Sequence, residues 1–311
     1  MKIDGKQWKL CALGILIDIL YLSKKILSLI NRLQDQIEEI KPISSIVINN
    51  TRNIIGSFLL PMEVIKENGS WKLIPGKNLQ TYYIYYSLLQ MLKNREISFF
   101  IWIGCLEIPK EEFTPDDFKN VKILLKSQNL YHIIIKREIL EKNIKFVTTQ
   151  LNNIFQNFVD PQIHKDFLVE SWNAFNTINF KIGDKIKNYI GKLKFEYNIS
   201  AVDKNHENQN ALGDEITPSI WLIDIHVLLA PRTIIQAMPS SNIGLFISSF
   251  FPSGDILHTF PFREIILQSL LLCNYICFSS YSYARNFLIC CKRILSLGHE
   301  DISGKIYIFT N

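Results

Sequence analysis

Apolar residues recur at helical spacing through the first forty residues of the chain. Ile15, Ile19 and Leu22 belong to a stripe along one face of a helix predicted over Gln7–Ile40, and Pro42 ends that helix. An amphipathic face of this kind packs in the chain's own core or docks a partner helix. We favour core packing, because tertiary contacts are what usually stabilise helices.

Short apolar runs and helical stretches follow as far as about residue 200. The β-rich run Ile97–Ile103 predicts a buried strand. Thr114 and Pro115 are typical of a helix start, with the threonine as N-cap and the proline in the first turn. The other helices predicted here are Tyr82–Lys93, Lys136–Phe158, Lys165–Asn176 and Asp184–Leu193. We therefore expect a helix-rich amino-terminal domain.

A polar run with almost no large apolar residues separates this part from the rest of the chain. It covers Val202–Glu215 and is typical of an exposed linker. The chain is accordingly predicted to consist of a helix-rich domain over 1–201, a linker over 202–216 and an α/β domain over 217–311.

The last part of the chain alternates between strand and helix patterns. A strand over 220–223 is followed by Asp224, and a second strand, Tyr275–Phe278, is followed by Ser279 and Ser280. Two helices, Phe262–Leu272 and Tyr283–Leu295, and a final strand, Lys305–Phe309, complete the pattern. Such alternation predicts a parallel sheet. We expect the strand that ends at Asp224 and the strand that ends at Ser279 to be neighbours. Asp224 would then lie beside Ser279 or Ser280 at one sheet edge.

Composition and charge exclude several classes of protein. A hydrophobic fraction of 48% excludes disorder of the whole chain, and the net charge of +5 is spread out rather than concentrated in a polybasic arm. The apolar stretch Leu10–Leu22 is shorter than the ~20 residues of a spanning helix and contains Asp18, so no membrane anchor or signal peptide is expected. These features predict a soluble intracellular protein.

Four cysteines occur in the last part of the chain. Cys273, Cys277, Cys290 and Cys291 match no zinc-ligand spacing and have no paired histidines beside them. We interpret them as buried thiols that fill apolar positions.

The strand order and the two polar strand ends resemble the haloacid-dehalogenase superfamily, in particular its carboxyl-terminal-domain phosphatase branch. That resemblance implies that Asp224 is a nucleophile and a magnesium ligand, and that Ser279 or Ser280 binds phosphate. His226 stands where the family has a second aspartate, and Leu228 where it has threonine. Arg285, Lys292 and Lys305 are the candidates for the phosphate-balancing cation. A hard cation needs several oxygen ligands, and this motif offers one acid, so magnesium is expected only if the site is active.

Within that superfamily the chain resembles the 38K proteins of baculoviruses and related insect viruses. The resemblance implies a nucleocapsid-assembly or virion structural factor with a degenerate phosphatase-like fold, located in the host nucleus or the virion. Other nucleocapsid proteins would be its partners, with an indirect association with packaged DNA. Two alternatives stay open: an active magnesium-dependent phosphoprotein phosphatase, and a helical interaction module without phosphatase ancestry.

Overall fold

The computed structural model describes residues 7–8, 52–107, 114–158, 165–202, 218–302 and 305–310. The predicted helix Gln7–Ile40 lies outside these residues, except that Gln7–Trp8 form the short strand β1. Most of the predicted linker also lies outside them. Among the described residues, no helix combines the length and the apolar character needed to cross a bilayer.

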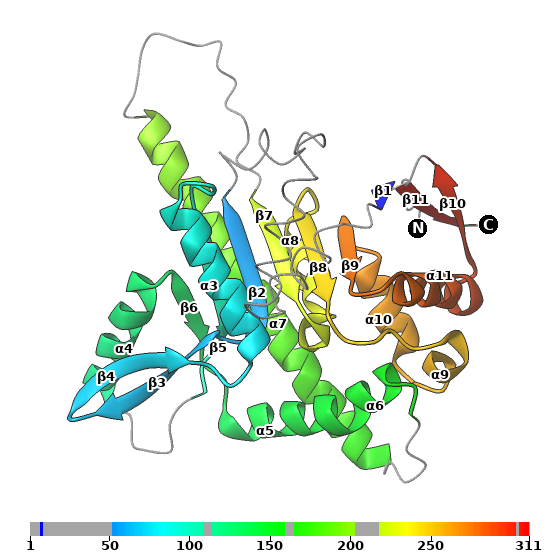
Figure 1. Cartoon of the computed structure of the whole chain (residues 1–311), viewed down its shortest axis with the longest axis horizontal. Coiled ribbons are helices and arrows are strands. Elements are labelled where there is room, and N and C mark those ends of the chain that lie inside the picture. Colours follow the sequence, from blue (N-terminus) through cyan, green and yellow to red (C-terminus); the bar gives the residue numbers. More distant parts are fainter. Residues whose placement is uncertain are drawn as a thin grey trace, which may run out of the picture.

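A six-stranded parallel sheet forms the centre of the molecule (Figure 1). The strand order is β6-β5-β2-β7-β8-β9. The strands are β2 (Asn53–Leu59), β5 (Phe100–Cys105), β6 (Leu130–Ile133), β7 (Ser219–Ile223), β8 (Asn242–Ile247) and β9 (Tyr275–Phe278). Three strands precede residues 203–217 and three follow them, so one sheet joins the two parts of the chain. Counted along the chain, the order is 3-2-1-4-5-6, which is that of a doubly wound α/β sheet.

Two strand predictions for the last part of the chain are wrong. β7 and β9 are not neighbours, because β8 lies between them and pairs with both. The predicted final strand lies outside the parallel sheet. It is β11 (Lys305–Thr310), which pairs antiparallel with β10 (Leu297–Ile302) and with β1. The parallel α/β architecture is confirmed, but the haloacid-dehalogenase arrangement of its strands is not.

One face of the sheet is covered chiefly by α7 (Lys165–Val202), a single helix of 38 residues (Figure 1). The sequence predicted two helices here. They are continuous because Ile178, Ile182 and Ile186 keep one fully buried stripe across the expected break. α5 (Arg137–Phe146), α8 (Ala230–Ala237), α10 (Arg263–Leu270) and α11 (Tyr281–Leu295) contribute to the same core. Helices were predicted at the positions of α5, α10 and α11, and all three are confirmed. α5 continues through a π-helical turn, η2 (Val147–Leu151), into α6 (Asn152–Phe155).

The opposite face is covered by α3 (Leu79–Lys93) and α4 (Pro115–Ser127). A second core lies between these helices and the sheet, where Tyr85 packs edge-on against Phe100 and Trp102. The Trp102 indole donates a hydrogen bond to Ser57 Oγ at 2.7 Å, so its polar edge is satisfied inside the core. The strand and helix predicted in this region are confirmed by β5 and α3.

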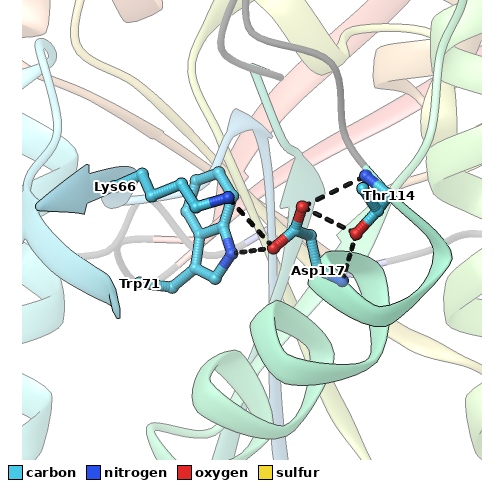
Figure 2. A network of polar contacts seen from close by, with 4 residues as sticks. All are labelled: Lys66, Trp71, Thr114 and Asp117. Carbon is cyan, nitrogen blue, oxygen red and sulfur yellow. Dashed lines mark hydrogen bonds and ion pairs between the residues drawn. The ribbon is translucent and has the colours of Figure 1, made fainter. Parts of the chain in front are cut away.

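A hairpin of β3 (Met62–Glu67) and β4 (Ser70–Pro75) docks on the start of α4 through Asp117 (Figure 2). Asp117 Oδ1 accepts hydrogen bonds from the Trp71 indole at 2.7 Å and from Lys66 Nζ at 3.4 Å. Its Oδ2 accepts from the Thr114 backbone at 3.1 Å and from the Thr114 hydroxyl at 2.8 Å. Thr114 caps α4 in return, which confirms the predicted helix start.

The remaining short helix, α9 (Gly254–His258), packs against α11. The four cysteines of this part are buried thiols, as predicted. Burial raises the pKa of Cys290 to about 12. At neutral pH that thiol is protonated, and a protonated thiol is a poor nucleophile.

Candidate functional site at the carboxyl edge of the sheet

The direction of winding reverses between β2 and β7, which are adjacent in the sheet. In open α/β sheets, ligands bind in the crevice outside the carboxyl ends of the strands at this switch point. Asp224 follows β7 directly and therefore stands at this edge. Ser248 and Ser249 follow β8, and Ser279 follows β9. One strand end after another thus presents a small polar side chain.

Asp224 is held by hydrogen bonds from the neighbouring strand end. Its Oδ1 accepts from the hydroxyls of Ser248 and Ser249, each at 3.1 Å. Its backbone N–H donates to the carbonyl of Phe246 at 2.7 Å. No protein group within the described residues donates to Oδ2. The carboxylate is therefore oriented by one oxygen and has acceptor capacity left on the other.

The backbone of Asp224 has a conformation that L-residues rarely adopt. Its φ is 73° and its ψ is 174°, a region occupied almost only by glycine. Such a conformation costs about 1–3 kcal/mol and is concentrated at functional sites, where the surrounding structure enforces it. The strain directs attention to this residue rather than to its neighbours.

The two candidate serines after β9 have different surroundings. Ser279 Oγ donates to the backbone carbonyl of Ser248 at 3.2 Å, which connects it to the Asp224 cluster. Ser280 is the N-cap of α11 and accepts from the backbone of Ser282. The expected proximity of Asp224 to these serines is therefore indirect, because Ser248 lies between Asp224 and Ser279.

His226 lies on a short 3-10 helix, η3 (Ile225–Val227), directly after Asp224. Its ring stacks on Phe58 of β2, with centroids 4.8 Å apart and planes 3° apart. Burial lowers the pKa of His226 below its ordinary value, and the nearby Asp224 carboxylate opposes that shift. The imidazole is therefore neutral at pH 7, and its stacking joins the ends of β2 and β7 across the switch point.

Asn179 of α7 fixes the segment that follows β7. Its side-chain oxygen accepts from the backbone N–H groups of Leu229 and Ala230, at 2.9 and 3.0 Å. Its side-chain nitrogen donates to the carbonyl of His226 at 3.0 Å. Gly183 brings α7 close to this segment, because a Cβ there would lie 2.7 Å from Thr233. Helix α7 thus serves as the support of the site.

None of the predicted cations lies at one of these strand ends. Arg285 and Lys292 are exposed on α11. Lys305 lies on β11, in the separate antiparallel sheet. Leu228 is buried in the core. Within the described residues, no group of three or more His, Cys, Asp or Glu side chains is placed to hold a metal ion.

Sequence reasoning missed Ser248, Ser249, Asn179 and Phe58. A signal for the two serines exists in the run Asn242–Ile247, which is apolar, flanked by Ser-Ser pairs and therefore typical of a buried strand. Asn179 has no comparable signal, because its importance depends on a contact 47 residues away in the chain.

The strand order defines a doubly wound, Rossmann-like domain, and its polar edge lies where such domains bind ligands. The model of glycosyltransferase family 20 matches residues 207–309, about a third of the chain, and this segment includes Asp224, Ser248, Ser249 and Ser279.

Relatives and solved structures agree with this match. A Dictyostelium discoideum protein, alpha,alpha-trehalose-phosphate synthase [UDP-forming] A, is 29% identical over 254 residues, which is 79% of this chain and 29% of the relative. The amino-terminal domain of Candida albicans trehalose-6-phosphate phosphatase superposes with a TM-score of 0.58 at 19% identity, over 84% of this chain and 47% of that one. A Burkholderia xenovorans synthase in complex with glucose-6-phosphate gives a TM-score of 0.51 at 15% identity, over 83% and 47%. This chain therefore spans less than half of each.

These findings overturn the resemblance to haloacid dehalogenases and 38K proteins. The match over 207–309 covers the same residues on which that resemblance rested. The hypotheses of a nucleocapsid factor, a phosphatase of that superfamily and a helical interaction module are wrong. Location in a host nucleus or virion has no support. The nucleocapsid partners and DNA association were drawn from the same resemblance and stay untested.

Proposed function

We propose that the chain is a trehalose-phosphate-synthase-like glycosyltransferase domain whose carboxyl sheet edge binds a hexose phosphate. The observation that carries the proposal is Asp224 at the switch point, whose backbone is strained and whose carboxylate accepts hydrogen bonds through one oxygen only. A carboxylate oxygen is a strong acceptor for sugar hydroxyls, and a fixed acceptor orients the sugar relative to a second substrate. The names of the relatives supply the substrate class: one forms UDP, and one solved structure contains glucose-6-phosphate.

Asp224 is the residue that we expect to contact the sugar. Ser248 and Ser249 position it through Oδ1, which leaves Oδ2 for the ligand. The neutral His226 ring is held against Phe58, so it adds no positive charge beside Asp224. Synthesis of a phosphorylated disaccharide is part of the proposal rather than a finding, because the chain spans only part of each relative.

Isothermal titration calorimetry of the full chain with glucose 6-phosphate, and separately with UDP-glucose, tests the proposal. We expect binding of at least one, and a loss of roughly 10- to 100-fold in affinity in Asp224→Asn, which corresponds to one charge-assisted hydrogen bond. Asp116→Asn is the matched control, because that carboxylate is exposed on α4. The proposal fails if the folded wild-type chain binds neither sugar, or if Asp224→Asn binds as tightly as wild type.

A further inference from the structure

A cavity lies at the outer edge of the sheet, away from the Asp224 cluster. It has a volume of about 580 Å³, is open to solvent, and is lined by α4, the end of β6 and the middle of α7. Lys119 and Lys122 line it from α4, Lys181 and Lys185 from α7, and His132 from β6. The two sites share no residue, and β5 separates β6 from the switch point. The volume is within the usual range of small-molecule sites, roughly 300–1,000 Å³.

The positive charge of this cavity is not neutralised by the acid that lines it. Asp184 already accepts from Lys187 at 2.5 Å through Oδ1 and from Asn188 at 2.8 Å through Oδ2. Within the described residues, Lys122 and Lys185 form no ion pair. Two cations therefore face the same space, and neither is paired with the one carboxylate that lines it.

Neighbouring lysines contribute to the lowered pKa values of two groups in this cavity. Burial, followed by the charges of Lys192, Lys122 and Lys126, lowers the pKa of Lys185. Burial, followed by Lys185 and Lys122, lowers the pKa of His132. No carboxylate opposes either shift. Like charges kept this close destabilise the protein, and an anion between them would reverse that repulsion.

The walls of the cavity are not purely polar. Phe118 of α4 lines it beside His132, with ring centroids 6.5 Å apart. The lining lysines act as compact point charges, and lysine is a common ligand of phosphate groups. An aromatic wall beside such charges fits a ligand with a ring and a phosphate.

We propose that this cavity binds a small phosphate monoester, such as a nucleoside monophosphate or a sugar phosphate. Lys122 and Lys185 would contact the phosphate, and Phe118 would pack against the ring. Lys181 is partly engaged by the carbonyl of Ile134 at 3.5 Å, so it would have a smaller part. This site goes beyond the proposed glycosyltransferase function and does not depend on it.

The test compares the full wild-type chain with Lys122→Gln/Lys185→Gln and a charge-matched control, Lys72→Gln/Lys77→Gln. The control lysines are exposed and already paired, with Glu67 and Glu107. Calorimetry with AMP, glucose 6-phosphate and inorganic phosphate separates nucleotide, sugar and bare anion. All titrations are repeated in the Asp224→Asn background, so that binding of glucose 6-phosphate at the sheet edge is not mistaken for binding in this cavity.

We expect AMP or glucose 6-phosphate to bind in the Asp224→Asn background, and Lys122→Gln/Lys185→Gln to weaken that binding by about tenfold or more. The control double variant should bind normally. Without ligand, Lys122→Gln/Lys185→Gln should melt higher than wild type, because two repelling charges are gone, so a loss of binding would not reflect unfolding. The proposal is overturned if neither AMP nor glucose 6-phosphate binds, if inorganic phosphate binds as tightly as either of them, or if the control variant loses as much affinity.

Discussion

The carboxylates of Asp117, which is largely buried, and Asp224, which is half-buried, have contrasting surroundings. Both oxygens of Asp117 are occupied, by Trp71 and Lys66 on one side and by Thr114 on the other (Figure 2). Asp224 receives two serine hydroxyls on one oxygen, and within the described residues nothing donates to the other. Asp117 also has ordinary helical backbone geometry, whereas Asp224 is strained.

The difference distinguishes the structural role of Asp117 from the ligand-binding role that we propose for Asp224. A carboxylate with every acceptor position filled stabilises a docked hairpin and leaves nothing for a ligand. A residue with a strained backbone costs stability, and such strain is concentrated at functional sites. One carboxylate oxygen of Asp224 is also left to accept from a ligand.

The largest effect is expected when the support beneath Asp224 is removed. Asn179→Leu leaves the backbone groups of His226, Leu229 and Ala230 without their buried partner. Each unpaired group costs about 1–3 kcal/mol, so we expect the free energy of unfolding to fall by about 3–5 kcal/mol. Urea unfolding monitored by circular dichroism measures this.

Asn188→Leu is the matched control, since it makes the same substitution on the same helix at an exposed position. Its expected change is within about 0.5 kcal/mol. If the two variants lose similar stability, Asn179 is not the support of the carboxyl edge, and the rigidity of Asp224 needs another explanation.

Local patterns in the sequence predicted much of the architecture. The Thr114 cap, the helices at α3, α10 and α11, and the strand at β9 follow from residue type and period alone. Asp224 was identified because it follows an apolar strand. The position of each strand in the sheet could not be read in the same way, because it depends on contacts between distant segments.

The omission of β8 shows how one missed strand changes a functional conclusion. Without β8, Asp224 and Ser279 become neighbours, and the pair then resembles a phosphatase motif. With β8 in place, Ser248 lies between them and donates a hydrogen bond to the Asp224 carboxylate. The backbone strain of Asp224 could not be predicted from the sequence either, because an aspartate does not indicate a glycine-like conformation.

A smaller effect is expected from the backbone of Asp224 itself. Asp224→Gly and Asp224→Ala both remove the carboxylate, but only glycine adopts a φ of 73° and a ψ of 174° readily. We expect the glycine variant to be more stable than the alanine variant by about 1–2 kcal/mol, by urea unfolding. Both should weaken binding of the hexose phosphate at the sheet edge.

The same pair of substitutions at Asp116 is the control. That residue lies in the first turn of α4, where alanine is better than glycine by about 0.5–1 kcal/mol. The sign of the difference should therefore reverse between the two positions. Alanine being the more stable variant at both would mean that the backbone at 224 is not strained.

The smallest effect is expected for Asp117, in the decrease of the free energy of unfolding at acid pH. Hydrogen bonds from the Trp71 indole, then from the Thr114 hydroxyl and backbone, hold the pKa of Asp117 well below its ordinary value, and Lys66 adds to this. Because the folded pKa is below the unfolded value of about 3.9, the unfolded state binds the proton first. The stabilisation is complete above that value and is lost as the pH falls through the folded pKa.

Asp117→Asn should therefore be less stable than wild type at pH 7 and should lose less stability than wild type between pH 5 and pH 3. Urea unfolding at a series of pH values measures both. Trp71→Phe removes the largest cause of the pKa shift while keeping an aromatic ring, so its curve should lie between those of wild type and Asp117→Asn. Parallel curves for all three proteins would mean that Asp117 is not held as a charged, fully bonded group, and the contrast with Asp224 would then lose its basis.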